Sequence, residues 1–267
     1  MDKTLIQDGR TVRYREEGSG LPVLLLHGFA EDGTIWEAVA PRLSSGCRLL
    51  VPDLPGSGGS GLLPGEPSID ALADSLKAVI DELGIDECVL VGHSMGGYVS
   101  LAFAEKYPHR LKAFGFFHST AYADSEEKRA GRRKSIEFIR QHGAAPFIRQ
   151  SMPNLFAADT QKHRPGLVEE IIHRYSGFSP ESLVYYYEAM IRRPDRVSVL
   201  QHFPGPILFL MGAADQVIPY EQALKQCHEP AISVIHTLDH SGHMGMLEEP
   251  ERGSDLLESF LNFVQYS

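Results

Sequence analysis

The chain has 267 residues, of which 43% are hydrophobic and 22% charged, and this size suits one globular core with room for an inserted segment. Its net charge of −10 at pH 7 argues against nucleic acid as a partner. No signal-peptide core opens the sequence and no apolar run approaches membrane-spanning length, so we expect a cytoplasmic protein without a membrane partner. The odd cysteine count and the absence of metal-ligand spacing predict free thiols at Cys47, Cys88 and Cys227.

Strands and helices alternate over the first 119 residues. A hairpin is predicted around Asp8-Gly9, because this dipeptide supplies the positive φ angles of a tight turn. Apolar runs typical of strands buried on both faces are Leu21–Leu26, Arg48–Pro52, the run ending at His93, and Leu111–Phe117. The apolar period predicts helices over Thr34–Leu43 and from a cap at Ser68 to about Leu83. The alternation predicts a mainly parallel sheet covered on both faces.

The segment around Ser94 combines a strand, a sharp turn and a helix. An apolar run leads into Gly92-His93-Ser94-Met95-Gly96, and a helix-competent segment follows at once. A nucleophile at such a turn has a strained backbone, so the residues two before and two after it need to be small. Ser94 is therefore the candidate nucleophile, with the N–H of Met95 at a helix N-terminus facing any negative charge that develops.

The alternation stops near residue 120 and helical patterns alone continue to about residue 195. Predicted helices cover Glu126–His142, Ala145–Gln150, Leu167–Tyr175 and Glu181–Arg192. The stretch is too long for a plain connection, so we interpret it as a helical lid inserted into the core and packed over the Ser94 side of the sheet. Within it, the basic cluster at residues 128–134 is interpreted as a solvated helix face.

The last third returns to strands and helices. Strands are predicted at Pro206–Met211 and Ile232–Leu238, followed by loops that contain Asp215 and His243, and helices are predicted at Tyr220–Cys227 and Pro250–Val264. Loops at the carboxyl ends of parallel strands converge on one crevice. A serine nucleophile needs a base, which needs an orienting acid. The bases available beside the site are His243, His27, His93 and His240, and the acids are Asp215, Asp124 and Asp239.

The order of Ser94, Asp215 and His243, together with the His27-Gly28-Phe29 loop, resembles the serine α/β-hydrolases with a helical lid, among them bacterial carboxylesterases, enol-lactonases and carbon–carbon bond hydrolases. The resemblance implies an α/β-hydrolase core at residues 1–119 and 196–267 and a lid at residues 120–195. It implies that Ser94 is the nucleophile, His243 the base and Asp215 the orienting acid.

Further roles are expected around these three residues. The resemblance implies an oxyanion hole formed by the backbone N–H groups of Phe29 and Met95. Residues expected to line a substrate pocket are His118, Met152, Phe156, Tyr186, Val217 and Met244. No cofactor or metal is expected, because the covalent mechanism needs only water.

The predicted activity is hydrolysis of a small carboxylic ester through an acyl-enzyme, so the expected partner is a small acyl substrate. Cleavage of a lactone or of a carbon–carbon bond next to a carbonyl is the alternative, because the same three residues serve all of these reactions. A non-catalytic ligand receptor and a cyanohydrin lyase are weaker alternatives. The sequence leaves the natural substrate and the oligomeric state open.

Overall fold

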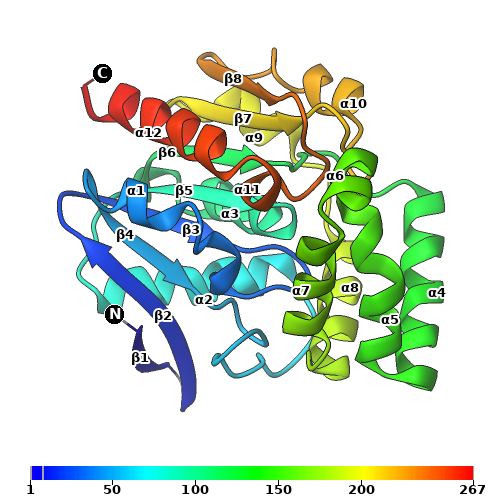
Figure 1. Ribbon diagram of the computed structural model, residues 1–267. Helices are drawn as coiled ribbons and strands as arrows, with labels where there is room; N and C mark the ends of the chain where they lie inside the picture. Colours follow the sequence, from blue (N-terminus) through cyan, green and yellow to red (C-terminus); the bar gives the residue numbers. More distant parts are fainter. Residues whose placement is uncertain (1, 8, 267) are drawn as a thin grey trace.

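The computed structural model describes residues 2–7 and 9–266, which form one eight-stranded sheet with flanking helices (Figure 1). The predicted turn residue Asp8 lies outside the described residues. The strands are β1 (Asp2–Gln7), β2 (Arg10–Gly18), β3 (Leu21–Leu26), β4 (Cys47–Pro52), β5 (Cys88–His93), β6 (Leu111–Phe117), β7 (Ile207–Gly212) and β8 (Ser233–Leu238). Their order across the sheet is β1-β2-β4-β3-β5-β6-β7-β8.

The sheet is mainly parallel, as predicted. Strands β3 to β8 pair in parallel, whereas β2 pairs antiparallel with both β1 and β4. The central strands β5 and β7 are buried along their whole length, which explains their unbroken apolar sequences. Because parallel strands point the same way, the loops that follow β3, β5, β7 and β8 lie at one edge of the sheet.

Helices cover both faces of the sheet. On one face lie α2 (Ile69–Glu82) and α3 (Met95–Lys106), and on the other lie α1 (Ala40–Leu43) and α12 (Pro250–Tyr266). The predicted cap of α2 is confirmed, since the Ser68 side chain accepts hydrogen bonds from two N–H groups of its first turn. Short helices that connect these elements are η1 (Gly33–Trp36), η2 (Pro108–Arg110), α9 (Val197–His202), α10 (Tyr220–Lys225) and α11 (Gly245–Glu248).

The single helix predicted over Thr34–Leu43 is wrong. The structure has the 3-10 turn η1 and then the short helix α1, separated by three residues. Pro41 explains the break, because it lies in the first turn of α1 and has no N–H to continue a helix that started earlier. The apolar residues that suggested the helix, Ile35, Val39 and Leu43, are nevertheless all buried.

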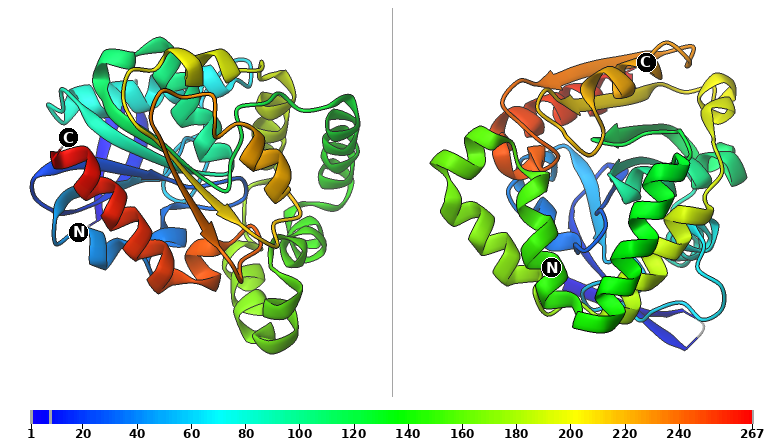
Figure 2. Two further views of the ribbon diagram at one scale, coloured as in Figure 1. Left: turned by 90° about the horizontal axis from the view of Figure 1, so that it is seen from above. Right: turned by 90° about the vertical axis from the view of Figure 1, so that its right-hand side faces the viewer.

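A block of helices is inserted between β6 and β7, and we call residues 126–192 the helical insertion. It contains α4 (Glu126–His142), α5 (Ala144–Ser151), η3 (Met152–Leu155), α6 (Ala158–His163), α7 (Pro165–Tyr175) and α8 (Pro180–Arg192). These helices stand at the end of the sheet toward which β6 and β7 point (Figures 1 and 2). The bounds of α4 match the prediction. The sequence does not predict η3 and α6, because they are too short to show a helical period of apolar residues.

The interpretation of residues 128–134 as a solvated helix face is confirmed for residues 130, 131, 133 and 134, which are exposed, but it is wrong for Lys128 and Arg132. Arg132 turns inward and binds the buried carboxylate of Asp124, with Nε 2.6 Å from Oδ2. Arg193 binds the same carboxylate at 3.0 Å from Oδ1. Lys128 donates to the carbonyl of Val217 at 3.2 Å. The cluster therefore helps attach α4 to the core, which the alternation of charge along the helix did not reveal.

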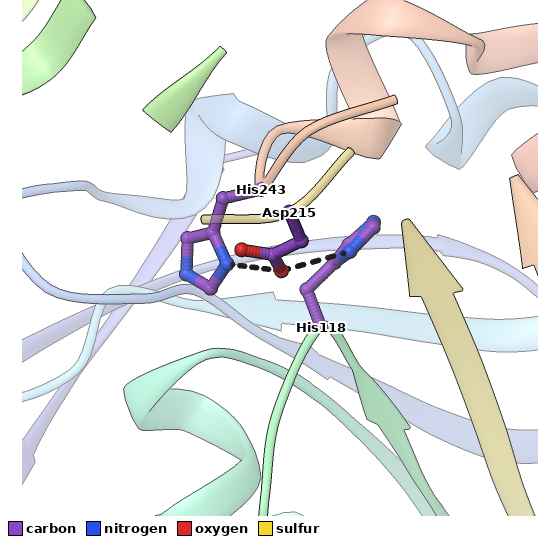
Figure 3. A group of neighbouring side chains, drawn as sticks. All are labelled: His118, Asp215 and His243. Atoms are coloured by element: carbon purple, nitrogen blue, oxygen red, sulfur yellow. Dashed lines mark hydrogen bonds and ion pairs between the residues drawn. The ribbon is translucent and has the colours of Figure 1, made fainter. Parts of the chain in front are cut away.

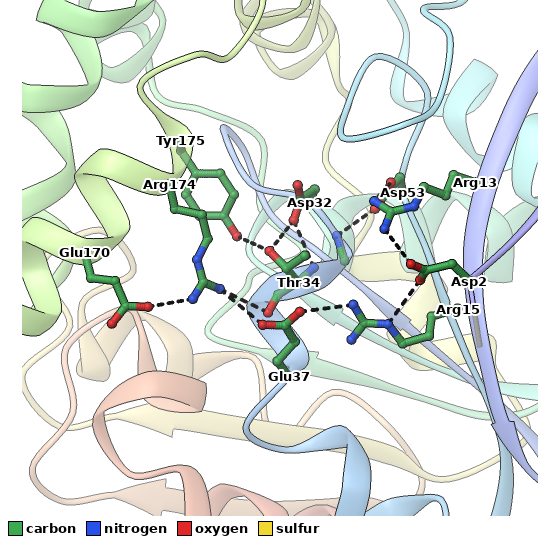
Figure 4. A network of polar contacts seen from close by, with 11 residues as sticks. Asp2, Arg13, Arg15, Asp32, Thr34, Glu37, Asp53, Glu170, Arg174 and Tyr175 are labelled. Carbon is green, nitrogen blue, oxygen red and sulfur yellow. Dashed lines mark hydrogen bonds and ion pairs between the residues drawn. The ribbon is translucent and has the colours of Figure 1, made fainter.

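Polar contacts also attach α7 to the sheet (Figure 4). Arg174 donates to the carbonyl of Thr34 at 3.4 Å and lies 3.7 Å from the carboxylate of Glu37. The hydroxyl of Tyr175 lies 3.2 Å from that of Thr34. Arg15 on β2 binds the same Glu37 at 3.1 Å. Because surface ion pairs contribute at most about 1 kcal/mol each, these contacts specify where α7 sits more than they stabilise the fold.

Among the residues that the structure describes, no helix is both long and apolar enough to cross a membrane.

Candidate active site

Ser94 stands at the apex of the turn between β5 and α3. Its backbone has φ 49° and ψ −114°, a conformation that a residue with a side chain adopts only when its surroundings impose it. The Ser94 N–H donates to the carbonyl of Phe117 at 3.0 Å, and its carbonyl accepts from the hydroxyl of Ser119 at 2.7 Å. Its own hydroxyl does not cap α3. The Ser94 hydroxyl therefore makes no hydrogen bond to the N-terminus of α3.

The glycines around Ser94 are required by close backbone approach. A Cβ atom on Gly92 would lie 2.2 Å from the carbonyl carbon of Gly96, and one on Gly96 would lie 2.6 Å from the carbonyl oxygen of Leu26. A Cβ atom on Gly97 would lie 2.3 Å from the hydroxyl of Ser119. These distances are shorter than any real Cβ contact, so the predicted steric reason for the Gly-x-Ser-x-Gly spacing is confirmed.

Asp215 and His243 are brought together by the loops after β7 and β8. His243 Nδ1 lies 2.8 Å from Asp215 Oδ2, and both side chains are buried. The other oxygen, Oδ1, accepts the backbone N–H groups of Val217 at 2.8 Å and Ile218 at 3.0 Å. Burial opposes ionisation of Asp215, but the facing imidazoles of His243 and then His118 outweigh it and hold its pKa below the ordinary value. The carboxylate is therefore anionic and fixes the orientation of the His243 ring.

His118 lies on the far side of the same carboxylate. Its Nδ1 atom is 3.4 Å from Asp215 Oδ2, so this oxygen stands between two imidazoles (Figure 3). His118 is 1% exposed and has φ 52°, and neither ring nitrogen meets hydrogen-bond geometry with any residue in the described part of the chain. Burial lowers its pKa to about 4, so the ring is neutral near pH 7. This contact with the acid was not predicted from the sequence.

Of the alternative bases, His27 and His93 hydrogen-bond to backbone groups and His240 is exposed. His27 accepts the N–H of Leu54 at Nε2, at 2.9 Å, and donates from Nδ1 to the carbonyl of Gly28 at 2.8 Å. His93 Nε2 donates to the carbonyl of His243 at 2.9 Å. His240 is exposed.

The alternative acids are also separated from His243. Asp239 is exposed, and Asp124 is enclosed by Arg132 and Arg193 at the base of the helical insertion. Burial opposes ionisation of Asp124, but these two guanidinium groups hold its pKa below the ordinary value. Asp215 is thus the acid that the structure brings to His243.

The two predicted oxyanion donors lie on opposite sides of Ser94 in the chain. Met95 is the first residue of α3, whose leading N–H groups have no acceptor within the helix. Phe29 follows Gly28, whose N–H donates to the buried carboxylate of Glu31 at 2.7 Å. Ala30 next to it has φ 60°, so this loop is held in an unusual conformation. Stabilisation of an oxyanion by these two groups stays a prediction.

The predicted pocket residues fall into two packed groups. Met152, Phe156 and Met244 are buried in the apolar cluster that includes α1 and α12. Tyr186 is buried in the cluster that includes α2 and α3, and Val217 packs against that cluster. The hydroxyl of Tyr186 donates to the carbonyl of Pro55 at 2.8 Å and lies 2.8 Å from that of Ser57, so it has a structural role. That any of these residues lines a substrate pocket stays a prediction.

Aromatic residues of the helical insertion reach the oxyanion loop. The ring of Phe29 stacks on Tyr187 with a centroid distance of 4.2 Å, and it meets Phe147 edge-on at 6.1 Å. The guanidinium group of Arg132 lies over the ring of Tyr187, 5.4 Å from its centroid. The helical insertion therefore supplies apolar surface beside the loop that carries Phe29.

Glu248 on α11 holds the loop that carries His243, and no motif in the sequence marks this residue. Its Oε1 atom accepts the N–H groups of Gly242 at 2.8 Å and Met244 at 3.2 Å, the residues on either side of His243. Its Oε2 atom accepts the N–H of Ala157 at 2.9 Å and the hydroxyl of Thr160 at 2.7 Å. Burial raises its pKa despite these four donors. Glu248 thus joins the His243 loop to the helical insertion.

One described group of side chains has donor atoms suited to a metal ion, namely His118, Asp215 and His243, whose ligand atoms lie within 4.8 Å of one another. Both Nδ1 atoms are directed at the same carboxylate oxygen, however (Figure 3). This is the geometry of a carboxylate that orients an imidazole.

A serine on a strand-to-helix turn, a buried His–Asp pair and a mainly parallel sheet are the features of the α/β-hydrolase fold. A family model described as "Alpha/beta hydrolase family" matches residues 23–255, and the chain belongs to this family.

Relatives and solved structures agree with this membership. A thermophilic esterase from Thermogutta terrifontis has a TM-score of 0.93 and 32% identity, with 99% of each chain covered. The dihydrolipoyllysine-residue acetyltransferase component of the acetoin cleaving system of Pseudomonas putida is 30% identical over 95% of this chain and 67% of its own length. The 2-hydroxy-6-oxo-2,4-heptadienoate hydrolase of Pseudomonas putida is 27% identical over 97% of this chain and 95% of its own.

Proposed function

We propose that the protein hydrolyses a small carboxylic ester through an acyl-enzyme on Ser94. The Ser94 hydroxyl attacks the ester carbonyl while Nε2 of His243 takes its proton. The N–H groups of Phe29 and Met95 stabilise the oxyanion. His243 then returns the proton to the departing alcohol, and a water activated by the same imidazole releases the acid and regenerates Ser94.

The hydrogen bond of 2.8 Å between His243 Nδ1 and Asp215 Oδ2 carries this proposal. A carboxylate at Nδ1 selects the tautomer in which Nε2 is free to accept a proton, and it stabilises the imidazolium that forms. The neighbouring residue of Ser94 contacts the same histidine, since His93 Nε2 lies 2.9 Å from the His243 carbonyl oxygen. This contact supports the assignment of the elbow and the base to one site.

The test is labelling by a fluorophosphonate probe together with turnover of short p-nitrophenyl esters. We expect the probe to label Ser94, and Ser94→Ala to lower turnover on the order of a million-fold without unfolding the protein. Ser100→Ala is the matched control, because Ser100 lies on α3, is buried and donates to the carbonyl of Gly96. Turnover that survives Ser94→Ala would refute Ser94 as the nucleophile. A wild type that neither reacts with the probe nor turns over the esters would favour a ligand-binding member of the family.

Hydrolysis of a carbon–carbon bond is the second candidate. It is supported by the similarity over nearly the whole chain to a hydrolase of 2-hydroxy-6-oxo-2,4-heptadienoate, a compound with no ester bond. Esters, lactones and diketones compared by kcat/KM separate these reactions, since they use the same three residues. An ester preference supports the first candidate, and turnover confined to diketones supports the second.

A further inference from the structure

Glu31 and His93 form a buried pair between the oxyanion loop and His243, and the proposed mechanism does not use either residue. His93 Nδ1 lies 3.0 Å from Glu31 Oε2, and both side chains are 1% exposed. The same oxygen accepts the N–H of Gly28 at 2.7 Å. On its opposite edge His93 Nε2 lies 2.9 Å from the carbonyl oxygen of His243.

The hydrogen-bond partners of His93 indicate which of its ring nitrogens carry a proton. A carbonyl oxygen only accepts, so Nε2 of His93 carries a proton. Glu31 Oε2 also accepts the Gly28 N–H, and an ionised Glu31 can share this oxygen with His93 only if Nδ1 of His93 carries a second proton. Burial alone would lower the pKa of His93 and raise that of Glu31, but their mutual attraction outweighs it and shifts both in the opposite direction. Both shifts favour the imidazolium form of His93 and the carboxylate form of Glu31.

The pair connects three segments that are distant in sequence. Glu31 holds the amide next to Phe29, His93 immediately precedes Ser94, and the contacted carbonyl belongs to His243. The fit is close, because a Cβ atom on Gly28 would lie 2.8 Å from His93 Nδ1 and 3.0 Å from Glu31 Oε2. A shift of either side chain would thus move the oxyanion loop relative to the base.

We infer that Glu31 and His93 are positioning residues that hold the oxyanion loop in register with His243 and keep a positive charge beside its ring. The inference rests on the proposed function. The ring centroids of His93 and His243 are 4.9 Å apart, and a nearby positive charge disfavours protonation of the base. Other titratable groups facing the pair are His27, near Glu31, and Asp215 and His118, near His93.

The variant Glu31→Gln removes the negative charge of Glu31 and keeps the size and shape of its side chain. The amide keeps the size of the side chain, and its oxygen still accepts from Gly28, but His93 loses its counter-ion and becomes neutral. We expect kcat to fall about 10- to 100-fold with little change in KM. The N–H groups of the oxyanion loop would be misplaced, and they act on the oxyanion of the transition state and not on the bound substrate. The acidic limb of kcat/KM should move to higher pH, since the positive charge of His93, whose ring centroid lies 4.9 Å from that of His243, is lost.

The matched control is Asp53→Asn, another buried carboxylate that accepts loop N–H groups, those of Gly33 and Gly59, both at 2.9 Å. It should leave the acidic limb where it is. A direct readout needs no variant: a ¹⁵N-edited imidazole spectrum of the wild type at pH 7 should show His93 doubly protonated, and Glu31→Gln should show it neutral.

A neutral His93 in the wild type, or a Glu31→Gln enzyme with unchanged kcat and an unchanged pH profile, would overturn the inference. If Glu31→Gln does not fold, the wild-type spectrum and the pH profile of Glu31→Asp decide in its place. Failure of the proposed function is seen separately, as a wild-type Ser94 that the fluorophosphonate probe does not label.

Discussion

The imidazole of His118 and the carboxylate of Asp215 meet in the interior with 3.4 Å between Nδ1 and Oδ2. Asp215 therefore faces a second histidine opposite His243. The His118 ring is fully buried, and burial lowers its pKa to about 4 from an ordinary value of 6.5. Because the unfolded chain binds this proton more readily than the folded protein does, acid favours unfolding as the pH falls from 6.5 toward 4.

His118→Asn should remove this acid sensitivity, and asparagine tolerates the positive φ of 52°. Between pH 7 and pH 5 the wild type should lose about 2 kcal/mol of unfolding free energy that the variant retains. Chemical denaturation at both pH values measures the difference, and groups common to both proteins cancel. Parallel pH dependences would mean that the pKa of His118 is the same in the folded and unfolded states.

Glu248→Ala should destabilise the protein and slow turnover together. The change leaves three buried N–H groups and the hydroxyl of Thr160 without their acceptor, at a cost of at least about 3 kcal/mol in unfolding free energy. The loop that carries His243 also loses its support. Thr160→Val removes one of the four donors and should cost about 1.5 to 3 kcal/mol with turnover retained. Equal effects of the two variants on kcat would argue against a role of Glu248 in holding His243.

Gly92→Ala and Gly131→Ala should have opposite effects on stability. The added methyl group at Gly92 would lie 2.2 Å from backbone atoms of Gly96, so the elbow cannot form without moving β5 or α3. At Gly131, in the middle of α4, nothing lies within 4 Å and the backbone is helical. There alanine should add about 0.5 to 1 kcal/mol of unfolding free energy. Thermal melts of the two variants against wild type measure both effects, and a Gly92→Ala protein with wild-type stability would contradict the close approach.

The three thiols should be unreactive in the native protein. All are buried, and burial raises the pKa of Cys47 to about 11 and those of Cys88 and Cys227 to about 12. Because the thiolate is the reactive form, we expect no fast reaction with a disulfide reagent at pH 8 and three equivalents after denaturation in guanidinium. A fast native equivalent would show that one of these cysteines becomes exposed.

The sequence could predict features that depend on neighbours along the chain. Strand and helix periods, the Ser68 cap and the small residues around Ser94 are local, so the parallel sheet and the elbow followed from them. The order of Ser94, Asp215 and His243 was also readable, because each residue follows an apolar strand and parallel strands bring their ends to one edge.

Contacts between distant segments were decided only by the tertiary structure. Nothing local reveals the partners of His93, His118 or Glu248, because each contacts a loop far away in sequence. The inward turn of Arg132 toward Asp124 likewise depends on how α4 packs on the core. Periodicity fixes which residues are buried, whereas the partner of a buried polar group is fixed only when the loops meet in three dimensions.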